Sequence, residues 1–369
     1  MSAPIGSTSG PILIVGGGIM GLSCAWRLSQ MGHLVSLYER DSVGFGASGV
    51  PYAALWPSAA TKRGQGHERH RDSLWKFPEF VRQLSEAAEM PIEFRRTGRI
   101  ELFTSADRRR AATKEAEVAC AEWPHFGDEP TQWIATPEEI RLLEPALEPT
   151  ELGSLVCNAT AYVSTSDLLA ALRSVSQRNG VSINEGCSVN DLWIDEGRAR
   201  GVITYRPVPG ASVLVTAGAW TSELCPELEQ AAPIVPVKGQ VILLRPSEPL
   251  FTRLIKKGRT YMIPTSSGEV LVGSTSEPEA GFDSQPTESA RQQLFESACE
   301  IVPALRDSSV VRQWVGHRPQ TSIRTPYVTR IESVPGLYVA AGHFKIGIAM
   351  APVIGEQVAE MMFAQETSE

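Results

Sequence analysis

The hydrophobic pattern changes period twice near the start of the chain, and these changes predict a strand, a helix and a second strand. Residues 11–15 (PILIV) are continuously apolar, as in a strand buried on both faces of a sheet. Residues 19–30 carry apolar side chains at helical spacing, and residues 33–39 (HLVSLYE) return to a strand pattern. A glycine-rich turn, GGGIMG, joins the first strand to the helix. This order predicts a βαβ unit.

Farther along, the pattern predicts more helices and many short strands, without a simple alternation of the two. Thr136 followed by Glu139 is a capping box, which marks where one of these helices begins. The predicted helices cover residues 107–122, 136–143 and 166–178. The predicted strands cover residues 99–103, 181–185, 200–205, 212–216, 237–244, 261–263 and 270–274. Pro and Gly turns separate the later strands, which favours an antiparallel sheet.

Two late segments return to the pattern of a dinucleotide-binding domain: VLVTAGAW at 213–220 and LYVAAGHFKIGIAMAP at 337–352. In each, an apolar strand runs into an Ala-Gly step, as it does where a strand end opens onto a bound cofactor. We therefore predict an α/β fold (α+β overall) in which a mainly antiparallel β-sheet domain interrupts a Rossmann-like domain. The Rossmann-like domain is expected at residues 1–92, 162–234 and 316–369, and the second domain at residues 93–161 and 235–315.

Length and charge agree with two domains and argue against one class of partner. The chain has 369 residues and 42% hydrophobic content, which is ample to bury two cores. Its net charge of −8 argues against a nucleic-acid-binding surface, because such a surface needs clustered Lys and Arg. The one basic run, Arg108 to Arg110, is diluted by Asp107 and Glu115, and we expect it to be a solvated helix face.

Cysteine usage and the lengths of the apolar runs indicate a cytoplasmic protein. The six cysteines are scattered singly, without a C-x-x-C pair or a metal-binding spacing, which suits a reducing compartment and predicts no metal site. No apolar run approaches the ~20 residues of a membrane-spanning helix, so no membrane partner is expected. Residues 1–10 lack the charged and apolar regions of a secretory signal, and we expect a loose lead-in there.

The glycines of the first turn have separate steric roles in a dinucleotide site. Gly16 permits the tight turn, Gly18 removes a Cβ that would collide with a pyrophosphate, and Gly21 lets the helix lie close to the sheet. The helix N-terminus then offers N–H groups and a positive dipole end to the diphosphate. Glu39 closes the second strand and accepts hydrogen bonds from ribose hydroxyls, which disfavours NADP.

The segment from Gly342 to Gly347 favours FAD over NAD. It leads directly into an apolar helix, whose N-terminus would face the C2 carbonyl of a flavin, where negative charge collects on reduction. A strand-to-helix turn without a ligand is the alternative interpretation.

Several motifs, in their order and spacing, resemble the FAD-dependent D-amino-acid oxidase superfamily over nearly the whole chain, and most closely its glycine oxidase branch of the thiamine-biosynthesis type. These motifs are GGGIMG with Glu39-Arg40, GFGASGVPYAALWP (44–57), VTAGAW, PVKGQ (236–240), YMIP (261–264), VGHRPQT (315–321) and AGHFKIGIAMAP. The resemblance implies FAD as the cofactor. Related sarcosine oxidases can tether flavin through a cysteine, but none lies beyond Cys299, so we predict that FAD is held noncovalently.

The resemblance also implies a role for each matching residue. Arg318 matches the arginine that holds the substrate carboxylate, Tyr261 the tyrosine beside it, and Lys345 a further substrate contact. Lys345 stands where glycine oxidases usually carry arginine, and Arg259 where a histidine is common, so the exact substrate is left open. Cofactor contacts are implied for the glycine turn, the acid that follows, the loop past the pyrophosphate and flavin, one backbone contact to adenine, and the segment closing over the flavin edge: Gly16, Gly18, Ile19, Met20, Gly21, Glu39, Arg40, Ala47, Ser48, Tyr52, Ala53, Ala54, Val189, Gly342, His343, Phe344, Lys345, Ile346, Gly347, Ile348 and Ala349.

The chemistry of an α-amino acid fits these residue types. A guanidinium such as that of Arg318 binds a planar carboxylate through two parallel hydrogen bonds, Tyr261 adds a neutral donor, and Lys345 adds a point charge near the carboxylate or the flavin. A neutral amine can drive hydride transfer to flavin without a strong protein base, so His317 and His343 are expected to be structural. The ordinary alternatives are a surface ion pair for Arg318, core packing for Tyr261 and solvent exposure for Lys345.

These observations predict an FAD-dependent oxidase that deaminates glycine or small amino acids. Oxygen would reoxidise the flavin and give hydrogen peroxide, and the imine would hydrolyse to a 2-oxo acid and ammonia. Two alternatives stay open: a sarcosine or D-amino-acid dehydrogenase with another electron acceptor, and a flavin-binding partner subunit without independent turnover. The expected partners are a small amino-acid or amine substrate and oxygen, and self-association into a homo-oligomer is left open.

Overall fold

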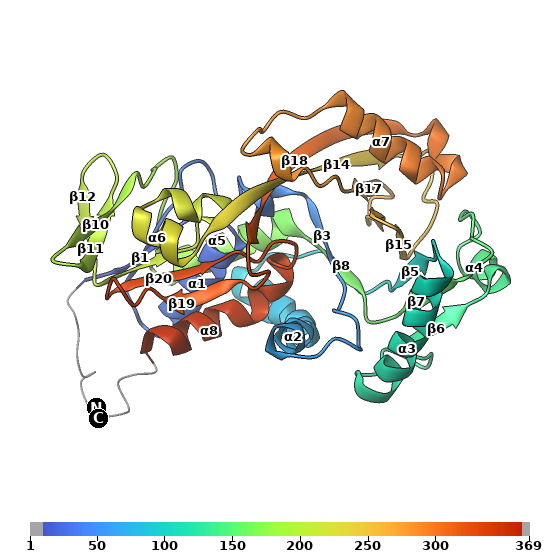
Figure 1. The fold of residues 1–369 in the computed structure, drawn as a ribbon, viewed down its shortest axis with the longest axis horizontal. Helices are drawn as coiled ribbons and strands as arrows, with labels where there is room; N and C mark the ends of the chain where they lie inside the picture. Colours follow the sequence, from blue (N-terminus) through green and yellow to red (C-terminus); the bar gives the residue numbers. More distant parts are fainter. Residues whose placement is uncertain (1–9, 364–369) are drawn as a thin grey trace.

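The computed structural model describes residues 10–363, and a six-stranded sheet containing the predicted βαβ unit forms one half of the molecule (Figure 1). The strand order is β19-β20-β13-β1-β2-β9. The bounds are Ile12–Val15 (β1), Val35–Tyr38 (β2), Ser182–Asn184 (β9), Ser212–Val215 (β13), Tyr327–Arg330 (β19) and Leu337–Ala341 (β20). β1 is parallel to β2 and to β13, and β13 is parallel to β20. The carboxyl ends of these strands therefore meet at one edge, where α/β folds bind ligands.

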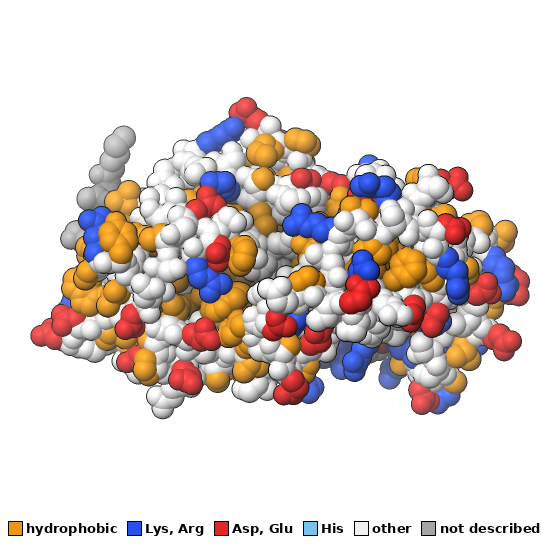
Figure 2. All heavy atoms as spheres, turned by 90° about the horizontal axis from the view of Figure 1, so that it is seen from above, with side chains coloured by type: hydrophobic (Ala, Val, Ile, Leu, Met, Phe, Trp, Pro, Cys, Tyr) orange, Lys and Arg blue, Asp and Glu red, His pale blue; other side chains and the backbone are white. Residues whose placement is uncertain are grey.

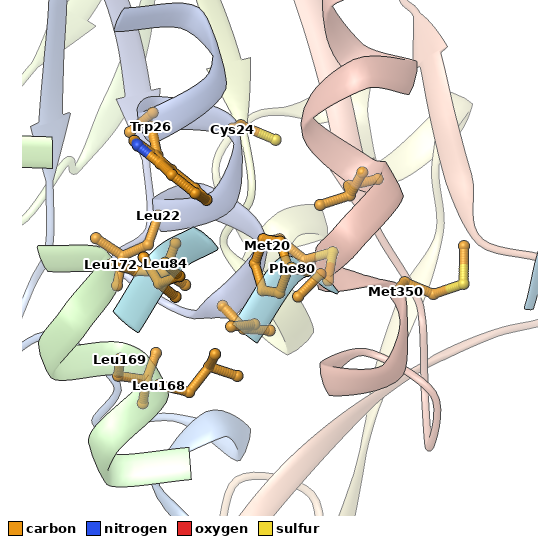
Figure 3. Packing of buried hydrophobic residues seen from close by; sticks show 14 of the residues in the cluster. Met20, Leu22, Cys24, Trp26, Phe80, Leu84, Leu168, Leu169, Leu172 and Met350 are labelled. Atoms are coloured by element: carbon orange, nitrogen blue, oxygen red, sulfur yellow. The ribbon is translucent and has the colours of Figure 1, made fainter. Parts of the chain in front are cut away.

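Four helices beside this sheet bury its hydrophobic core (Figure 3). Their bounds are Ile19–Gln30 (α1), Gln65–Ala88 (α2), Thr165–Arg178 (α5) and Ala351–Phe363 (α8). α1 has the predicted bounds and buries most of its residues, as expected for the helix of a βαβ unit. Leu22 of α1, Leu84 of α2 and Leu172 of α5 are fully buried in this one cluster.

An eight-stranded sheet forms the other half, in the order β18-β14-β17-β16-β15-β5-β7-β6. All neighbours in it are antiparallel except β15 and β5. The bounds are Arg99–Leu102 (β5), Gln132–Ala135 (β6), Ser154–Cys157 (β7), Ile234–Arg245 (β14), Leu254–Lys257 (β15), Thr260–Pro264 (β16), Val270–Gly273 (β17) and Ser309–Thr321 (β18). The helices of this half are Ala106–Glu122 (α3), Pro137–Leu143 (α4) and Glu288–Cys299 (α7). The capping box predicted at Thr136 and Glu139 is present.

The long strands β14 and β18 link the two halves (Figure 1). They pair along nearly their whole length, so that Val237 lies opposite Arg318 and Gly239 opposite Gly316. Near its end β18 also contacts the segment after β20, through a bridge between Gln320 and His343. The strand pair thus carries Arg318 from the antiparallel sheet to the edge of the parallel one.

The shorter elements complete the chain. One small sheet has the order β3-β8-β4, with bounds Tyr52–Leu55 (β3), Ala161–Ser164 (β8) and Phe94–Arg95 (β4). The other comprises Asp191–Asp195 (β10), Arg198–Ile203 (β11) and Pro207–Pro209 (β12). The remaining helix is Pro226–Ala231 (α6), and single helical turns cover Ala47–Gly49, Gly218–Glu223, Pro278–Ala280, Pro303–Asp307 and Ile348–Met350.

The predicted α/β (α+β) fold class is confirmed, and two local predictions were wrong. The expected loop at 44–57 contains a helical turn and strand β3, because β3 pairs with the antiparallel β8. Arg108 is partly buried and not on a freely solvated face: its guanidinium binds the carboxylates of Glu101 and Glu115 at 2.9 Å each, and Glu101 is buried. Only Arg109 and Arg110 of that run are exposed.

The division into two domains stays a proposal. The six-stranded sheet takes its strands from the three ranges assigned to the Rossmann-like domain, but β18 belongs to the eight-stranded sheet and crosses the boundary proposed at 315/316. The lead-in expected at 1–10 lies, apart from Gly10, outside the described residues.

Charged side chains of both signs are interspersed on the face shown in Figure 2. Among residues 10–363, no helix combines the length and the apolar character needed to cross a membrane. In the same range, no group of three or more His, Cys, Asp or Glu side chains is placed to hold a metal ion.

Candidate active site

One cavity of about 540 Å³ runs from the glycine turn after β1 to the ends of β16 and β18. It is lined by Arg318, Tyr261 and every residue predicted to contact the cofactor except Gly21. The structure thus brings together residues from distant parts of the sequence, as a site for one elongated ligand and a smaller second one requires.

The glycine turn forms the nucleotide end of this cavity. Gly16 has a φ of +108°, and a Cβ there would lie 2.7 Å from the Thr216 carbonyl oxygen. A Cβ on Gly21 would lie 2.0 Å from the Gly16 carbonyl oxygen, which explains why this glycine packs against the turn and does not line the cavity. A Cβ on Gly18 would meet only the Ser48 Oγ, at 3.4 Å, so the Gly18 backbone is open to the cavity, as close approach of a pyrophosphate requires.

Glu39 is fixed beside this turn. Its carboxylate accepts hydrogen bonds from the Gly17 N–H at 2.7 Å and from the Asp41 N–H at 2.9 Å. A carboxylate has about four lone-pair sites, so it can still accept from a ribose diol. The neighbouring Arg40 guanidinium lies 4.3 Å from the ring centre of Trp220, which belongs to the VTAGAW motif. Both side chains line the cavity, and Trp220 was missed as a site residue.

The segment after β20 closes the middle of the cavity and is tied to both halves of the molecule. The Phe344 N–H donates to the Pro319 carbonyl at 3.0 Å, directly after Arg318, and Phe344 adopts a φ of +48°. The Ser73 hydroxyl of α2 donates to the Ala349 carbonyl at 2.6 Å. These contacts fix the backbone of the segment predicted to cover the flavin edge.

His343 offers a direct test of whether a cofactor fits this segment. Its side chain is buried against the cavity, and neither ring nitrogen has a hydrogen-bond partner among the described residues. Burial lowers the pKa of His343 to about 4, so the ring is neutral near pH 7. A buried imidazole needs a polar partner. A bound FAD would supply polar atoms here, so the residues present fit the cofactor.

Arg318 and Tyr261 lie at the far end of the cavity, and two glycines make room for them. A Cβ on Gly239 would lie 2.2 Å from the Arg318 Nη1, and a Cβ on Gly273 would lie 2.5 Å from the Tyr261 ring. The Arg318 guanidinium donates to the Thr275 carbonyl at 3.1 Å, which leaves most of its donors available. Burial raises the pKa of the Tyr261 phenol more than the positive charge of Arg318 lowers it, so Tyr261 is a neutral donor.

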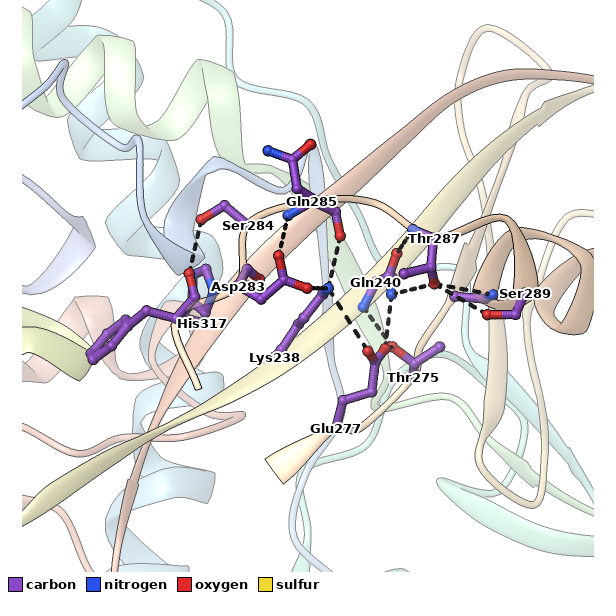
Figure 4. A network of polar contacts seen from close by, with 12 residues as sticks. Lys238, Gln240, Thr275, Glu277, Asp283, Ser284, Gln285, Thr287, Ser289 and His317 are labelled. Atoms are coloured by element: carbon purple, nitrogen blue, oxygen red, sulfur yellow. Dashed lines mark hydrogen bonds and ion pairs between the residues drawn. The ribbon is translucent and has the colours of Figure 1, made fainter. Parts of the chain in front are cut away.

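A polar network around the buried Lys238 and Gln240 holds the segment whose Thr275 carbonyl accepts from Arg318 (Figure 4). Lys238 is 1% exposed, and its Nζ donates to the Asp283 carboxylate at 2.6 Å and to the Gln285 carbonyl at 2.7 Å. Hydrogen bonding to Lys238 holds the pKa of Asp283 below its ordinary value. The Gln240 amide donates to Glu277 at 2.9 Å in the same network. β14 therefore supplies both Gly239, which makes room for Arg318, and the side chains that hold the Thr275 segment beside it.

Several residues that line the site were missed from the sequence. Trp56 packs edge to face against Tyr261, with ring centres 5.6 Å apart. His70 of α2 is buried, its Nδ1 lies 2.8 Å from the Ser58 hydroxyl, and burial, ahead of nearby positive charge, lowers its pKa to about 4. Gly239 carried a usable signal, because a glycine inside a predicted strand often marks the close approach of another group. His70 carried none.

This fold and cavity define a class: an α/β protein with a dinucleotide-type glycine turn at the edge of a parallel sheet and a cavity that Arg318 and Tyr261 line at the far end. The model of the FAD dependent oxidoreductase family named DAO matches residues 11–361, and the chain belongs to this family. It is therefore an FAD-dependent oxidoreductase.

Three comparisons show how far the likeness extends. Glycine oxidase of Geobacillus kaustophilus is 28% identical over 360 residues, which cover 97% of this chain and 94% of the relative. Hydrogen cyanide synthase subunit HcnC of Pseudomonas aeruginosa is 29% identical, over 93% of this chain and 90% of the subunit. The crystal structure of the Geobacillus kaustophilus glycine oxidase superposes with a TM-score of 0.88 and 25% identity, over 97% of this chain and 96% of that one. The resemblance to glycine oxidases is thus confirmed along the whole fold.

Proposed function

We propose that this protein oxidises glycine or another small amino acid to the imine, which hydrolyses to the 2-oxo acid and ammonia, and that oxygen accepts the electrons and becomes hydrogen peroxide. The observation that carries the proposal is the placement of Arg318 and Tyr261 at one end of the cavity whose other end is the glycine turn. The similarity to glycine oxidase along the whole chain supports the same substrate class.

Each residue at the substrate end has a defined task in this proposal. Arg318 binds the substrate carboxylate with two hydrogen bonds, because only one of its five N–H donors is engaged by Thr275. Tyr261 donates a third hydrogen bond from a neutral phenol. Together they orient the Cα–H of the substrate toward the middle of the cavity, beside His343. FAD, when bound there, supplies the hydride acceptor.

The protein needs no strong base for this reaction, since a substrate with a neutral amine already has the lone pair that drives loss of hydride. Three buried histidines line the cavity, and one of them, His317, has its Nε2 3.1 Å from the Asp283 carbonyl oxygen. The other two, His70 and His343, have pKa values lowered to about 4 by burial. Both are neutral at physiological pH, which suits positioning and packing roles. Activity is therefore expected to follow the protonation of the substrate amine and not that of a histidine.

An oxygen electrode and a peroxide assay test the proposal on the purified protein. Glycine, sarcosine and both enantiomers of alanine and proline form the panel, and we expect steady oxygen consumption with stoichiometric peroxide for at least one of them. Flavin that is reduced by substrate but reoxidised slowly by air would replace the oxidase by a dehydrogenase with another acceptor. No flavin reduction by any amine or amino acid would contradict the proposal.

A second candidate is a flavin-binding subunit that turns over only with a partner chain. The similarity to HcnC, a subunit by its name, favours this alternative. Steady turnover by the isolated chain would exclude it. The compartment is also part of the proposal: the six cysteines are all free, which suits the reducing cytoplasm.

A further inference from the structure

Two positive side chains line the substrate end of the cavity, and a third belongs to the hairpin turn that precedes Tyr261. Arg318 and Lys345 both line it, and the hydrogen bond from the Phe344 N–H to the Pro319 carbonyl holds the neighbours of these two residues together. Arg259 stands in the turn between β15 and β16, two residues before Tyr261. After burial, the charges of Arg318 and Arg259 are what lower the pKa of Lys345, so both guanidinium groups act on the Lys345 ammonium.

Among the described residues, none of these three cations has a carboxylate within ion-pair distance. Arg318 donates to a backbone carbonyl, and the Lys345 ammonium lies over the Phe344 ring, 5.2 Å from the ring centre. The carboxylate of Glu277 is the one whose negative charge acts on Arg318. It already accepts a hydrogen bond from Gln240 at 2.9 Å and lies 4.0 Å from the buried Lys238 ammonium.

One other basic residue of the same hairpin does have an acidic partner. Lys256 lies in β15, and its ammonium binds the buried Glu101 carboxylate at 2.8 Å. The lack of acidic partners at the substrate end of the cavity therefore contrasts with this ion pair to a buried carboxylate in the same hairpin. A substrate with a single carboxylate neutralises only one of three charges, and unpaired cations in a partly desolvated site are costly.

We propose that Lys345 and Arg259 form a second anion-binding position beside Arg318, and that the preferred substrates carry two acidic groups. The substrate class is then dicarboxylic α-amino acids or imino diacids, with one carboxylate on Arg318 and Tyr261 and the other on Lys345 and Arg259. This inference rests on the proposed function, because it assigns the substrate class of the same site.

The test compares two achiral substrates of nearly equal size that differ by one charge: iminodiacetate and its monoamide, N-(carbamoylmethyl)glycine. Each is mixed anaerobically with the holoprotein, and the rate and concentration dependence of flavin reduction are recorded. We expect the diacid to be favoured roughly 10-fold or more in the ratio of rate constant to dissociation constant, the scale of a close charged pair. Equal values for the two compounds would overturn the inference.

Variants locate the second position. Arg259→Gln and Lys345→Gln should each bring the diacid-to-monoamide ratio toward one. The control is Lys257→Gln, which removes a positive charge from the same hairpin at a residue that does not act on Lys345. A ratio that falls equally in all three variants would indicate a general field effect and would contradict a specific position, as would a ratio that none of them changes.

A binding measurement separates this inference from the proposed function. Oxydiacetate has two carboxylates but no amine, so it cannot be oxidised to an imine, and methoxyacetate is its monoanionic counterpart. We expect oxydiacetate to perturb the flavin absorbance at roughly 10-fold lower concentration than methoxyacetate. If no amino acid reduces the flavin, the proposed function fails while this titration still decides the anion position. If amino acids reduce it and oxydiacetate binds no more tightly than methoxyacetate, only the inference fails.

Discussion

Adding one methyl group at Gly239 should move the Arg318 guanidinium without removing it. The new Cβ would lie 2.2 Å from the Arg318 Nη1, whereas ordinary contacts begin at 3.4 Å, so the guanidinium must retreat by about 1.2 Å (3.4 minus 2.2). A misplacement of ~1 Å in a substrate-positioning group costs about 100-fold in rate, or about 2.7 kcal/mol of transition-state stabilisation. The obstructed atoms are the end of a flexible side chain, so folding should be nearly unaffected.

The assay for Gly239→Ala measures kcat/KM for the best amino-acid substrate together with flavin content and thermal stability. Gly316→Ala is the matched control, because Gly316 pairs with Gly239 across the two strands and lines the same cavity. A Cβ at Gly316 would meet its nearest neighbour, the Ala47 Cα, at an ordinary 3.6 Å. We expect kcat/KM to fall about 100-fold in Gly239→Ala alone, with flavin content and thermal stability near those of the parent. Equal kcat/KM in the two variants would refute the placement of Arg318 against Gly239 as the determinant of substrate orientation.

Four further predictions test other parts of the account. Arg318→Leu should lower kcat/KM for amino acids by about 30-fold to several thousand-fold, the equivalent of losing one partner of a buried charged pair, while an amine without a carboxylate should lose far less. Glu39→Ala should weaken FAD binding by about 1–3 kcal/mol, because it removes the acceptor for ribose and loosens the Gly17 turn; a fluorescence titration of apoprotein that gives the parental Kd would exclude this role. Acid precipitation should release the flavin into the supernatant as free FAD, and flavin that stays in the pellet would show a covalent link. Burial alone would raise the pKa of Glu101, but its partners, led by Arg108, hold that pKa at about 2, below the ordinary value of ~4.3. The ionised carboxylate therefore stabilises the fold above about pH 5, and its contribution is lost as the pH falls toward 2. In urea unfolding, Glu101→Gln should therefore cost about 3–5 kcal/mol at pH 7 and progressively less below pH ~5, and a cost independent of pH would count against the ion pairs.

The parts of the fold that could be predicted from sequence are those with a local cause. The glycine turn and the apolar period fix α1 at the predicted residues, and the capping box at Thr136 fixes the start of α4. α2 could not be predicted in the same way, because its apolar stripe is interrupted by Pro78 and by polar residues that become buried only in the folded chain, His70 among them. Tertiary packing selects the helix there.

The site divides along the same line. The site residues predicted from motif order all line the cavity except Gly21, because each motif is a backbone feature encoded within a few residues. The contacts that position Arg318 come instead from strands far apart in sequence, namely the clearance at Gly239 and the Thr275 carbonyl held by the Lys238 network. Arg108 was misjudged for a related reason, since its partner Glu101 precedes the helix and is buried in the sheet. Such pairings depend on register and sheet topology, which composition and periodicity do not specify.

Anaerobic reduction of the bound flavin tests the central claim most directly, because it isolates the reaction between the cofactor and an amino acid from the choice of electron acceptor. The purified protein is mixed with glycine and a panel of small and dicarboxylic amino acids in the absence of oxygen, and the visible flavin absorption band is followed. We predict that at least one amino acid bleaches the band, and that glycolate shifts the band without bleaching it. A band that remains unbleached with every member of the panel would contradict the assignment of this site to amino-acid oxidation.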